Sequence, residues 1–495
     1  NICGYMKKAD EQKADIVLFP ELAMTGYTCG DLFYQESLHD AVEAGLKDIL
    51  ACSEKYPALT VVVGLPVRLG IRLANCAAVI SEGCLRGLVS KTYLPDYGGF
   101  NESRWFSSVE EGTVAAIAGQ EATVGTDLLY RVGETTVGIE ICEDFFAPIA
   151  PSMFQALNGA EVILNLAASP EQTGKKRSRR ELIKAHSASG KCVYAYVSAG
   201  STESTADLVY SGHSMIVENG TVLKENENLI DSDYMIVQDC DLGRIRAERQ
   251  KNPTFRQAAY FYGDRQYLNE SMLGDAALRS DGDLYPVQKL PFIPTTKAER
   301  DAYCKEAFHI QAAGLAQRLK TINSNAVIGI SGGLDSTLAL LVCVEAMRIL
   351  GRPATDIYGV TMPCFGTSDR TYNNAWDLMK KLGINAKEIS IKNAVTLHFE
   401  DIGHDKSIHN GTYENSQARE RTQILMDYAS VVNGIVVGTG DLSELALGWC
   451  TYNGDHMSMY SVNGGIPKTL IRWMIETIAQ QPHFAAARAV LADIL

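Results

Sequence analysis

The segment 326–342 constrains the fold of this chain more than any other. Residues 326–330 are small or apolar and predict a buried parallel strand, and the apolar run 336–342 predicts the opening of a helix. Between them, residues 331–336 have the sequence Ser-Gly-Gly-Leu-Asp-Ser. Glycine lets the backbone approach an anion, and a helix N-terminus favours negative charge. The segment therefore predicts a phosphate-binding loop in an α/β domain, whereas a Gly-rich turn without a ligand is the simpler alternative.

The chemistry of this loop differs from that of common NTPases. The Gly-Lys-Ser/Thr ending of the usual NTPase loop is absent, so little holds the β- and γ-phosphates for γ-phosphoryl transfer. Asp335 can instead hold Mg²⁺ on a departing pyrophosphate. The stretch resembles the SGG-x-DS loop of the ATP-pyrophosphatase superfamily, whose members cleave ATP to AMP and pyrophosphate. The resemblance implies an ATP site made of Gly329, Ile330, Ser331, Gly332, Gly333, Leu334, Asp335 and Ser336.

The composition suits a globular protein with more than one domain. The chain has 495 residues, which is too long for one hydrophobic core. The net charge of −14 argues against nucleic acid or a membrane surface as a partner, and the basic run 175–180 is expected to be a solvated helix start. The 12 cysteines include no Cys-x-x-Cys pair, and no apolar run approaches the roughly 20 residues that span a bilayer. We therefore expect a cytoplasmic protein.

Short strands and helices alternate in the first half. Five runs rich in apolar residues predict strands, namely 16–19, 60–64, 137–141, 162–165 and 192–196. Two hairpins are also predicted, because Glu82-Gly83 and Asn219-Gly220 each separate two such runs. This mixture indicates a layered α/β domain.

The sequence divides into three parts. Residues 1–270 form the first α/β domain, and 271–296 are polar and rich in Gly, Asp and Pro, as is typical of a linker. A new helical pattern begins at Lys297 and leads into the phosphate loop. Residues 297–495 are therefore predicted to form a second α/β domain with a parallel, Rossmann-like sheet.

Glu21, Lys91 and Cys142 carry complementary chemistry in the first domain. Cys142 ends a predicted strand, and a thiol there can attack a carbonyl if a base takes its proton. Glu21, which follows another strand, can be that base and later donate the proton to a leaving amine. An ammonium such as that of Lys91 lowers the pKa of a nearby thiol and stabilises an oxyanion. Alone, each residue is more simply explained as a core or loop residue.

The local contexts of these three residues resemble those of one family. Residues 1–265 resemble a carbon–nitrogen hydrolase of the nitrilase superfamily, which uses a Glu-Lys-Cys triad. The resemblance implies an αββα sandwich, with Glu21 as base, Lys91 as oxyanion support and Cys142 as nucleophile. It also implies a first strand before Asn1. A glutamine site is implied at Tyr97, Ser169 and Lys175.

Further polar residues follow a strand in the second domain. Residues 435–441 predict a strand and a turn, in which Thr439 can hydrogen-bond a phosphate. Glu444, about one helical turn later, can complete a Mg²⁺ site with Asp335, because hard cations prefer oxygen ligands. Residues 297–475 resemble NAD⁺ synthetase, and the whole chain resembles the glutamine-dependent NAD⁺ synthetase family.

This resemblance implies an adenylating amidotransferase. ATP activates the nicotinate carboxylate of deamido-NAD⁺, and ammonia released from glutamine then displaces AMP to give NAD⁺. Thr439 would join the ATP site, and Asp335 and Glu444 would serve Mg²⁺. The implied deamido-NAD⁺ site comprises Asn415, Glu444, Trp449, Cys450, Thr451 and Tyr452. The resemblance further implies a large homo-oligomer and a C-terminal segment beyond Leu495 that closes over the dinucleotide.

Two other functions stay open from the sequence. One is a different ATP-dependent amidotransferase, against which the segments around Asn415 and Trp449 weigh. The other is a non-catalytic sensor of glutamine or nucleotide, against which the complete set of catalytic residues weighs. AMP formation from ATP and deamido-NAD⁺, with glutamine or ammonia, distinguishes the three.

Overall fold

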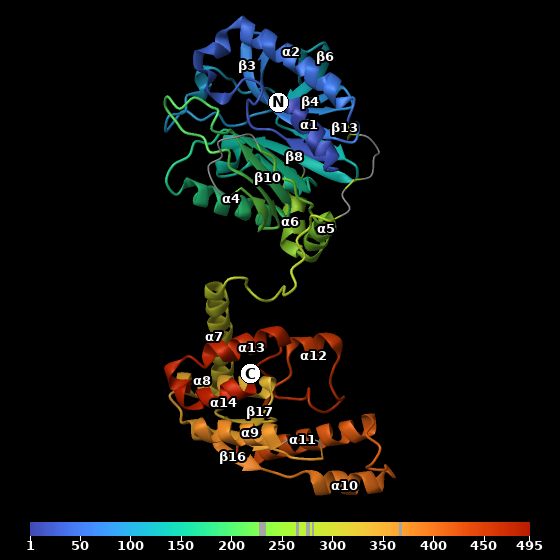
Figure 1. The fold of residues 1–495 in the computed structure, drawn as a ribbon, viewed down its shortest axis with the longest axis vertical. Coiled ribbons are helices and arrows are strands. Elements are labelled where there is room, and N and C mark those ends of the chain that lie inside the picture. Colours follow the sequence, from blue (N-terminus) through green and yellow to red (C-terminus); the bar gives the residue numbers. More distant parts are fainter. Residues whose placement is uncertain (227–233, 264–266, 274–277, 280–281, 366–368) are drawn as a thin grey trace. The chain divides into compact units, whose positions relative to one another are not determined.

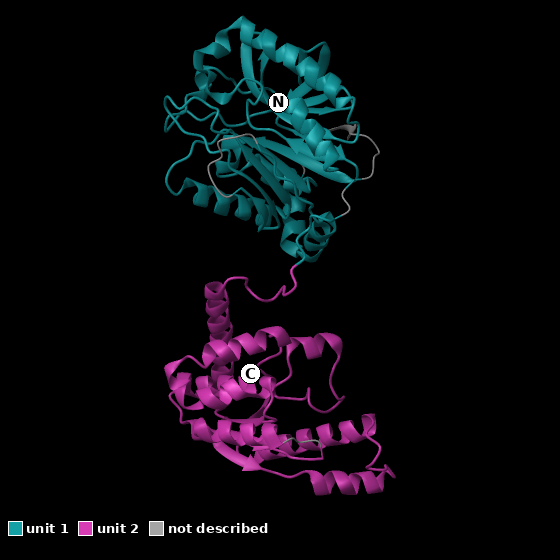
Figure 2. Cartoon of the chain, viewed as in Figure 1, with its two compact units in different colours: residues 1–287 teal, residues 288–495 magenta. Residues whose placement is uncertain are grey.

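The chain forms two compact units, residues 1–287 and 288–495 (Figures 1 and 2). The computed structural model describes residues 1–226, 234–263, 267–273, 278–279, 282–365 and 369–495. The division between the units falls inside the segment 271–296. Of that predicted linker, residues 274–277 and 280–281 lie outside the described residues, and 271–273 belong to a strand.

Two sheets form the first unit. One sheet has the order β1-β2-β3-β4-β6-β5. Its strands are β1 (Ile16–Leu18), β2 (Thr60–Leu69), β3 (Arg72–Ser81), β4 (Cys84–Ser90), β5 (Thr113–Ile117) and β6 (Gln120–Gly125). The other sheet has the order β12-β11-β10-β9-β8-β7-β13. Its strands are β7 (Leu128–Val132), β8 (Thr135–Ile141), β9 (Val162–Ala167), β10 (Val193–Ser198), β11 (Ser214–Glu218), β12 (Thr221–Glu225) and β13 (Leu268–Leu273).

The two sheets pack face to face, with helices outside. Val62 and Val79 of the first sheet share one buried cluster with Ile139 and Leu164 of the second. Outside the first sheet lie α1 (Ile2–Glu11) and α2 (Glu36–Ser53), and α4 (Lys175–Gly190) lies against the second (Figure 1). The short helix α3 (Pro151–Leu157) also packs on the second sheet. The unit also contains the helices α5 (Leu242–Lys251) and α6 (Pro253–Tyr262). The predicted αββα sandwich is confirmed.

Both predicted hairpins are present. The Glu82-Gly83 turn joins β3 to β4, and its residues have φ values of 50° and 76°. The Asn219-Gly220 turn joins β11 to β12, with φ values of 45° and 81°. Positive φ at both central residues matches the twist of the flanking strands, which explains why these dipeptides form tight turns.

A parallel sheet with the order β16-β15-β14-β17-β18 forms the second unit. Its strands are β14 (Asn325–Gly329), β15 (Ile357–Thr361), β16 (Asn385–Glu388), β17 (Gly434–Gly438) and β18 (Tyr460–Ser461). The helices are α7 (Lys297–Ile322), α8 (Leu334–Leu350), α9 (Asp369–Lys381), α10 (Lys392–Asp401), α11 (Gly411–Val431), α12 (Leu442–Leu447), α13 (Lys468–Ile478) and α14 (Arg488–Ile494).

Helices cover both faces of this sheet. Ala326 and Ile328 belong to a cluster with α7, α8, α9 and α13, whereas the intervening Val327 packs with α10 and α11. The chain order reverses between β14 and β17, and such a reversal creates a ligand-binding crevice at the carboxyl ends of the two strands. The predicted Rossmann-like architecture is confirmed.

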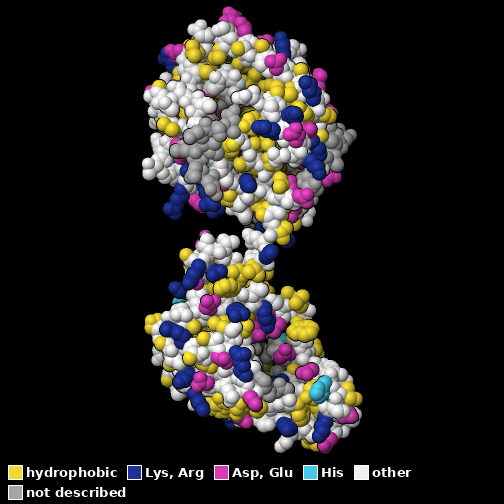
Figure 3. Space-filling model, viewed as in Figure 1, with side chains coloured by type: hydrophobic (Ala, Val, Ile, Leu, Met, Phe, Trp, Pro, Cys, Tyr) yellow, Lys and Arg dark blue, Asp and Glu magenta, His cyan; other side chains and the backbone are white. Residues whose placement is uncertain are grey.

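Acidic and basic side chains are interspersed on the face shown in Figure 3. In the part of the chain that the structure describes, no helix is both long enough and apolar enough to cross a membrane.

Candidate active sites

The predicted triad gathers where strands from both sheets end. Glu21 follows β1, Lys91 follows β4, and Cys142 follows β8. All three are almost fully buried, with exposed fractions of 1%, 1% and 3%. Lys91 Nζ lies 2.7 Å from Glu21 Oε1. Residues far apart in sequence thus form one enclosed cluster.

A second glutamate, which the sequence did not predict, also contacts the lysine. Lys91 Nζ donates to Glu102 Oε1 at 2.6 Å, and the Tyr27 hydroxyl donates to the same oxygen at 2.6 Å. Burial raises the pKa of Glu102 to about 7, although the charge of Lys91 opposes the shift. Burial lowers the pKa of Lys91, but Glu102 and Glu21 outweigh this effect and raise it well above its ordinary value. The neighbouring carboxylates therefore favour the ammonium form of Lys91.

The Cys142 thiol occupies a strained turn. Its φ is 46°, a left-handed conformation that costs energy for a residue with a side chain. Burial raises the pKa of Cys142 well above its ordinary value, Glu21 adds to the rise, and Lys91 opposes it. The predicted lowering by Lys91 is present, but burial outweighs it and the pKa of the thiol stays above its ordinary value. The thiol needs a base to remove its proton.

Asp144 holds the nucleophile turn against the loop that carries Lys91. Its carboxylate accepts from the backbone N–H groups of Ile141 at 2.9 Å, Thr92 at 3.0 Å and Tyr93 at 2.8 Å. Burial raises the pKa of Asp144 to about 7. These bonds fix the segments after β4 and β8 relative to each other.

The three residues predicted to bind glutamine have different environments. Tyr97 is 60% exposed, and its hydroxyl donates to Glu143 Oε1 at 2.5 Å. Ser169 is buried after β9, and its Oγ accepts from Arg179 Nη1 at 3.3 Å. Lys175 opens α4, where burial lowers its pKa while the charge of Cys142 opposes the shift. A cationic group, Lys175, and an anionic group, Glu143, thus lie beside the triad. Glu143 directly follows the nucleophile, and the sequence did not predict its involvement.

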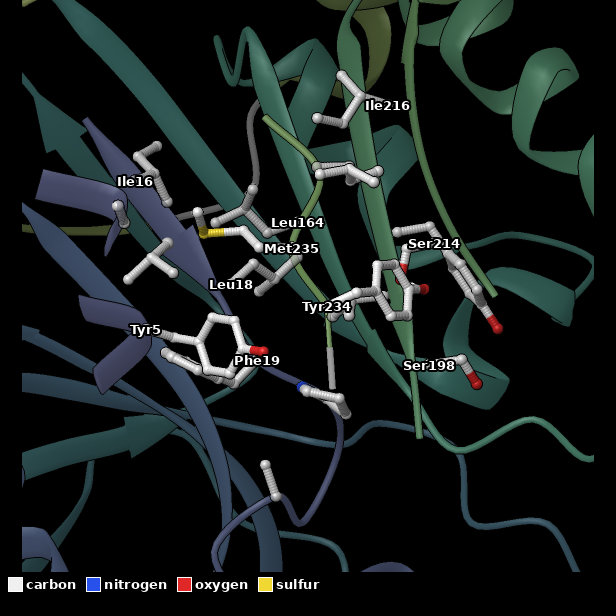
Figure 4. A pocket seen from close by; sticks show the side chains of 18 of the residues that line it. Tyr5, Ile16, Leu18, Phe19, Leu164, Ser198, Ser214, Ile216, Tyr234 and Met235 are labelled. Atoms are coloured by element: carbon white, nitrogen blue, oxygen red, sulfur yellow. Dashed lines mark hydrogen bonds between the residues drawn. The ribbon is translucent and has the colours of Figure 1, made fainter. Parts of the chain in front are cut away.

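This unit also contains a cavity of 850 Å³ (Figure 4). Apolar side chains of β1, β9 and β11 line it, including Leu18, Leu164 and Ile216, and Met235 enters from the segment 234–240. The lining includes Glu21 but neither Lys91 nor Cys142. This cavity is therefore not the space in front of the nucleophile.

The phosphate loop follows β14 as predicted. Gly332 has a φ of 83°, and a Cβ there would lie 2.1 Å from the Thr371 carbonyl oxygen, so no other residue fits. Ser331 Oγ lies 3.1 Å from Ser336 Oγ and accepts from the Gly333 N–H at 3.3 Å. These contacts close the loop onto the start of α8.

Carboxylates gather beside this loop. One oxygen each of Asp335, Asp441 and Glu444 lies within 4.8 Å of the others. Lys468 Nζ lies between them, at 3.0 Å from Asp335, 3.1 Å from Asp441 and 3.1 Å from Glu444. Burial lowers the pKa of Lys468, but its hydrogen bonds to these carboxylates outweigh burial and raise it.

Asp441 and Lys468 were not predicted. Asp441 Oδ1 accepts from the Glu444 N–H at 2.8 Å, and Glu444 Oε2 accepts from the Asp441 N–H at 3.2 Å. This capping box starts α12 and was visible in the sequence as Asp-x-x-Glu. Lys468 begins α13, 24 residues after Glu444, and no local pattern points to it.

Of the residues predicted to bind the dinucleotide, Asn415 lies on α11, Glu444 lies within α12, and the segment 449–452 follows α12. Asn415 Oδ1 accepts from Thr451 Oγ1 at 2.9 Å, which joins the two segments. Trp449 and Tyr452 are 77% and 82% exposed, and Cys450 is also exposed. Thr439 follows β17 directly. Exposed aromatic faces therefore lie in the same unit as the loop and the carboxylates.

The fold and these two sites define a carbon–nitrogen hydrolase joined to an NAD synthase. The family model described as carbon–nitrogen hydrolase matches residues 2–250, and the model described as NAD synthase matches residues 309–484. The chain is 41% identical over 505 residues to the glutamine-dependent NAD(+) synthetase of Mycobacterium tuberculosis strain H37Rv, a match that covers 98% of this chain and 73% of the relative. The chain belongs to the glutamine-dependent NAD(+) synthetase family.

A second relative agrees with this assignment. The glutamine-dependent NAD(+) synthetase of Mycobacterium leprae is 40% identical over 490 residues, covering 95% of this chain and 71% of the relative. A crystal structure of a glutamine-dependent NAD(+) synthetase from Cytophaga hutchinsonii matches with a TM-score of 0.43 and 20% identity, over 100% of this chain and 80% of that one.

Proposed function

We propose that this chain converts deamido-NAD⁺, ATP and glutamine into NAD⁺, AMP, pyrophosphate and glutamate. The presence of two complete sites in one chain carries the proposal. One is the buried Glu21–Lys91–Cys142 cluster, and the other is the phosphate loop with its carboxylates. We assign the glutaminase to residues 1–270 and the synthetase to residues 297–495.

In the glutaminase, Cys142 is the nucleophile. Glu21 removes the thiol proton as Sγ attacks the side-chain carbonyl carbon of glutamine, and Lys91 stabilises the oxyanion. Glu21 then gives the proton to the leaving nitrogen, the C–N bond breaks, and ammonia departs from a thioester. Water, deprotonated by Glu21, hydrolyses the thioester to glutamate and restores the thiol. The protonated resting thiol requires such a base.

Charged groups beside the triad suit the two ends of glutamine. Lys175 would pair with the α-carboxylate, and Ser169 would add a hydrogen bond. Glu143, which accepts from Tyr97, would pair with the α-ammonium. Opposite charges at fixed positions orient the side-chain amide toward Cys142.

In the synthetase, residues 329–336 and Thr439 would hold ATP. Mg²⁺ fits the donor set of Asp335, Asp441 and Glu444, because hard cations prefer oxygen ligands. Asp335 Oδ1 is moreover buried without a hydrogen-bond partner among the described residues. Bound Mg²⁺ would neutralise charge on the departing pyrophosphate. Lys468 offsets one of the three carboxylate charges. Asn415, Glu444 and the segment 449–452 would contact deamido-NAD⁺.

Substitution of the nucleophile tests this assignment. Cys142→Ala should abolish NAD⁺ synthesis from glutamine while sparing synthesis from ammonia, because Cys142 belongs only to the amide-cleaving cluster. Glu21→Gln should behave alike, because a neutral amide cannot accept the thiol proton. Loss of both activities in a folded Cys142→Ala protein would contradict the assignment. If wild-type protein forms no AMP from ATP and deamido-NAD⁺ with either nitrogen source, the proposed reaction is wrong.

We also infer a cytoplasmic homo-oligomer. All 12 cysteines are free, which suits a reducing compartment. The family resemblance supports the homo-oligomer. Light scattering after gel filtration would test the homo-oligomer, and a monomer at working concentration would contradict it.

A further inference from the structure

Asn75 contacts two members of the proposed triad from the middle of β3. Its side chain is buried, with a residue exposure of 1%, and its Nδ2 donates to Glu21 Oε1 at 2.7 Å. Its backbone carbonyl accepts from the Lys91 N–H at 2.9 Å. Asn75 has a fixed position, because it pairs with Pro66 of β2 and the next residue, Cys76, pairs with Ser90 of β4. One residue of a rigid strand therefore holds both the base and the lysine.

These contacts make the two oxygens of Glu21 unequal. Oε1 accepts from Asn75 Nδ2 and from Lys91 Nζ, each at 2.7 Å. Oε2 is buried and has no hydrogen-bond partner among the residues that the structure describes. A carboxylate oxygen that already accepts two donors is a poorer proton acceptor than one that accepts none. The free lone pairs of the base therefore lie on Oε2.

We propose that Asn75 is a positioning residue for the glutaminase reaction, one that occupies Oε1 of Glu21 together with Lys91 and reserves Oε2 for proton transfer. The inference rests on the proposed function of Glu21 and Cys142. The S–H bond of Cys142 breaks as an O–H bond forms at Oε2 and the C–S bond forms. That O–H bond then breaks as the leaving nitrogen gains the proton and the C–N bond breaks. Asn75 itself exchanges no proton.

The hydrogen bonding of Asn75 supports this role over packing alone. Its own Oδ1 is buried and has no hydrogen-bond partner within the described residues. An unsatisfied buried acceptor destabilises the folded protein, so an amide is a poor choice for stability at this position. The structure uses only the donor half of the side chain, and that half points at the base.

Asparagine also provides a donor without adding charge. Glu21 interacts electrostatically with Lys91, Glu102, Cys142, Tyr27 and Tyr210. Among these groups Lys91 is the cation and Glu102 a second carboxylate. A third carboxylate at position 75 would repel Glu21 when ionised, and would replace the amide as a donor only when protonated.

The test is Asn75→Asp in the full-length protein, which preserves the side-chain volume but removes the N–H donor. We expect glutaminase kcat to fall about 100-fold at pH 8, within the range that general-base catalysis contributes, with KM changed less than about threefold. The deficit should shrink as the pH is lowered, because a protonated carboxyl can donate to Oε1. Asn75→Ala should show the same loss without recovery at low pH. Synthesis from ammonia should not change in either variant.

Asn165→Asp is the matched control. Asn165 is also a fully buried strand asparagine of this unit, and it donates to the Tyr194 hydroxyl at 3.0 Å. If Asn75→Asp keeps wild-type kcat, or loses activity to the same extent as Asn165→Asp at every pH, the role of Asn75 is refuted. If Asn75→Asp does not fold, full kcat in Asn75→Ala refutes it. Cys142→Ala separates the two proposals, because glutaminase activity in that variant would refute the triad itself.

Discussion

At the scale of single residues, Asp335 is the residue of the phosphate loop that would bind Mg²⁺. Replacement of Asp335 by Ala should reduce NAD⁺ synthesis at least about 100-fold with glutamine and with ammonia alike, because a ligand of Mg²⁺ beside the departing pyrophosphate is lost. Glutaminase activity should remain measurable. Steady-state assays of AMP and glutamate report the two activities. Asp356→Ala is the matched control, since Asp356 pairs with Arg352 in the same unit. Unchanged synthesis from ammonia would mean that the loop is only a turn.

The same scale shows what the sequence could and could not predict. Glu21, Lys91 and Cys142 each stand in a recognisable local context, and the structure brings them together. Glu102 begins a short 3-10 helix whose polar sequence resembles that of a solvated segment, although it is 1% exposed. Asn75 lies within a strand pattern. Their roles come from contacts between distant segments, which no local pattern encodes.

At the scale of elements, the strands and hairpins were predictable because apolar runs and turn dipeptides are local signals. The predicted runs 137–141 and 162–165 fall within β8 and β9. Side-chain networks between elements were not predictable. Arg179 of α4 donates to His213 Nδ1 at 2.8 Å, and Glu225 Oε1 of β12 lies 2.9 Å from His213 Nε2. This network joins α4 to the β11–β12 hairpin.

The network makes stability depend on pH. Burial and then the charge of Arg179 lower the pKa of His213 from 6.5 to about 4, while Glu225 opposes and Lys176 adds to the shift. The unfolded chain therefore binds a proton between pH 6.5 and 4 that the folded chain does not, so stability falls as the pH is lowered through this window. When the pH falls from 7 to 5, the free energy of unfolding of the wild-type protein should decrease by roughly 2 kcal/mol because of His213, and His213→Gln should remove this contribution.

Urea unfolding at both pH values measures this difference in the free energy of unfolding, with a spectroscopic signal that reports on the first unit. His404→Gln is the control, because His404 is not buried and lies in the other unit. An equal loss of stability in wild type and His213→Gln would show that His213 is not the group responsible.

At the scale of the whole molecule, the chain joins two chemistries that share one intermediate. The predicted fold classes are confirmed. They were predictable because each unit carries a distinctive motif, the Glu, Lys and Cys contexts in the first unit and the Ser-Gly-Gly loop in the second. The supply of ammonia from one site to the other has no such local signature, and the expectation of direct transfer follows from the chemistry of ammonia.

Ammonia made at Cys142 should reach the synthetase site without mixing with solvent. At neutral pH most free ammonia in water is protonated and cannot attack an acyl adenylate, whereas a water-excluded route keeps it neutral. The measurement uses glutamine labelled with ¹⁵N in its amide, with excess unlabelled ammonium, at a pH where some free ammonia exists. We expect NAD⁺ labelled well above the isotope ratio of the bulk, because direct transfer does not sample the bulk pool. Cys142→Ala supplies the reference, since all of its product nitrogen comes from solvent. Wild-type label diluted to the bulk ratio would show that ammonia escapes before it reacts.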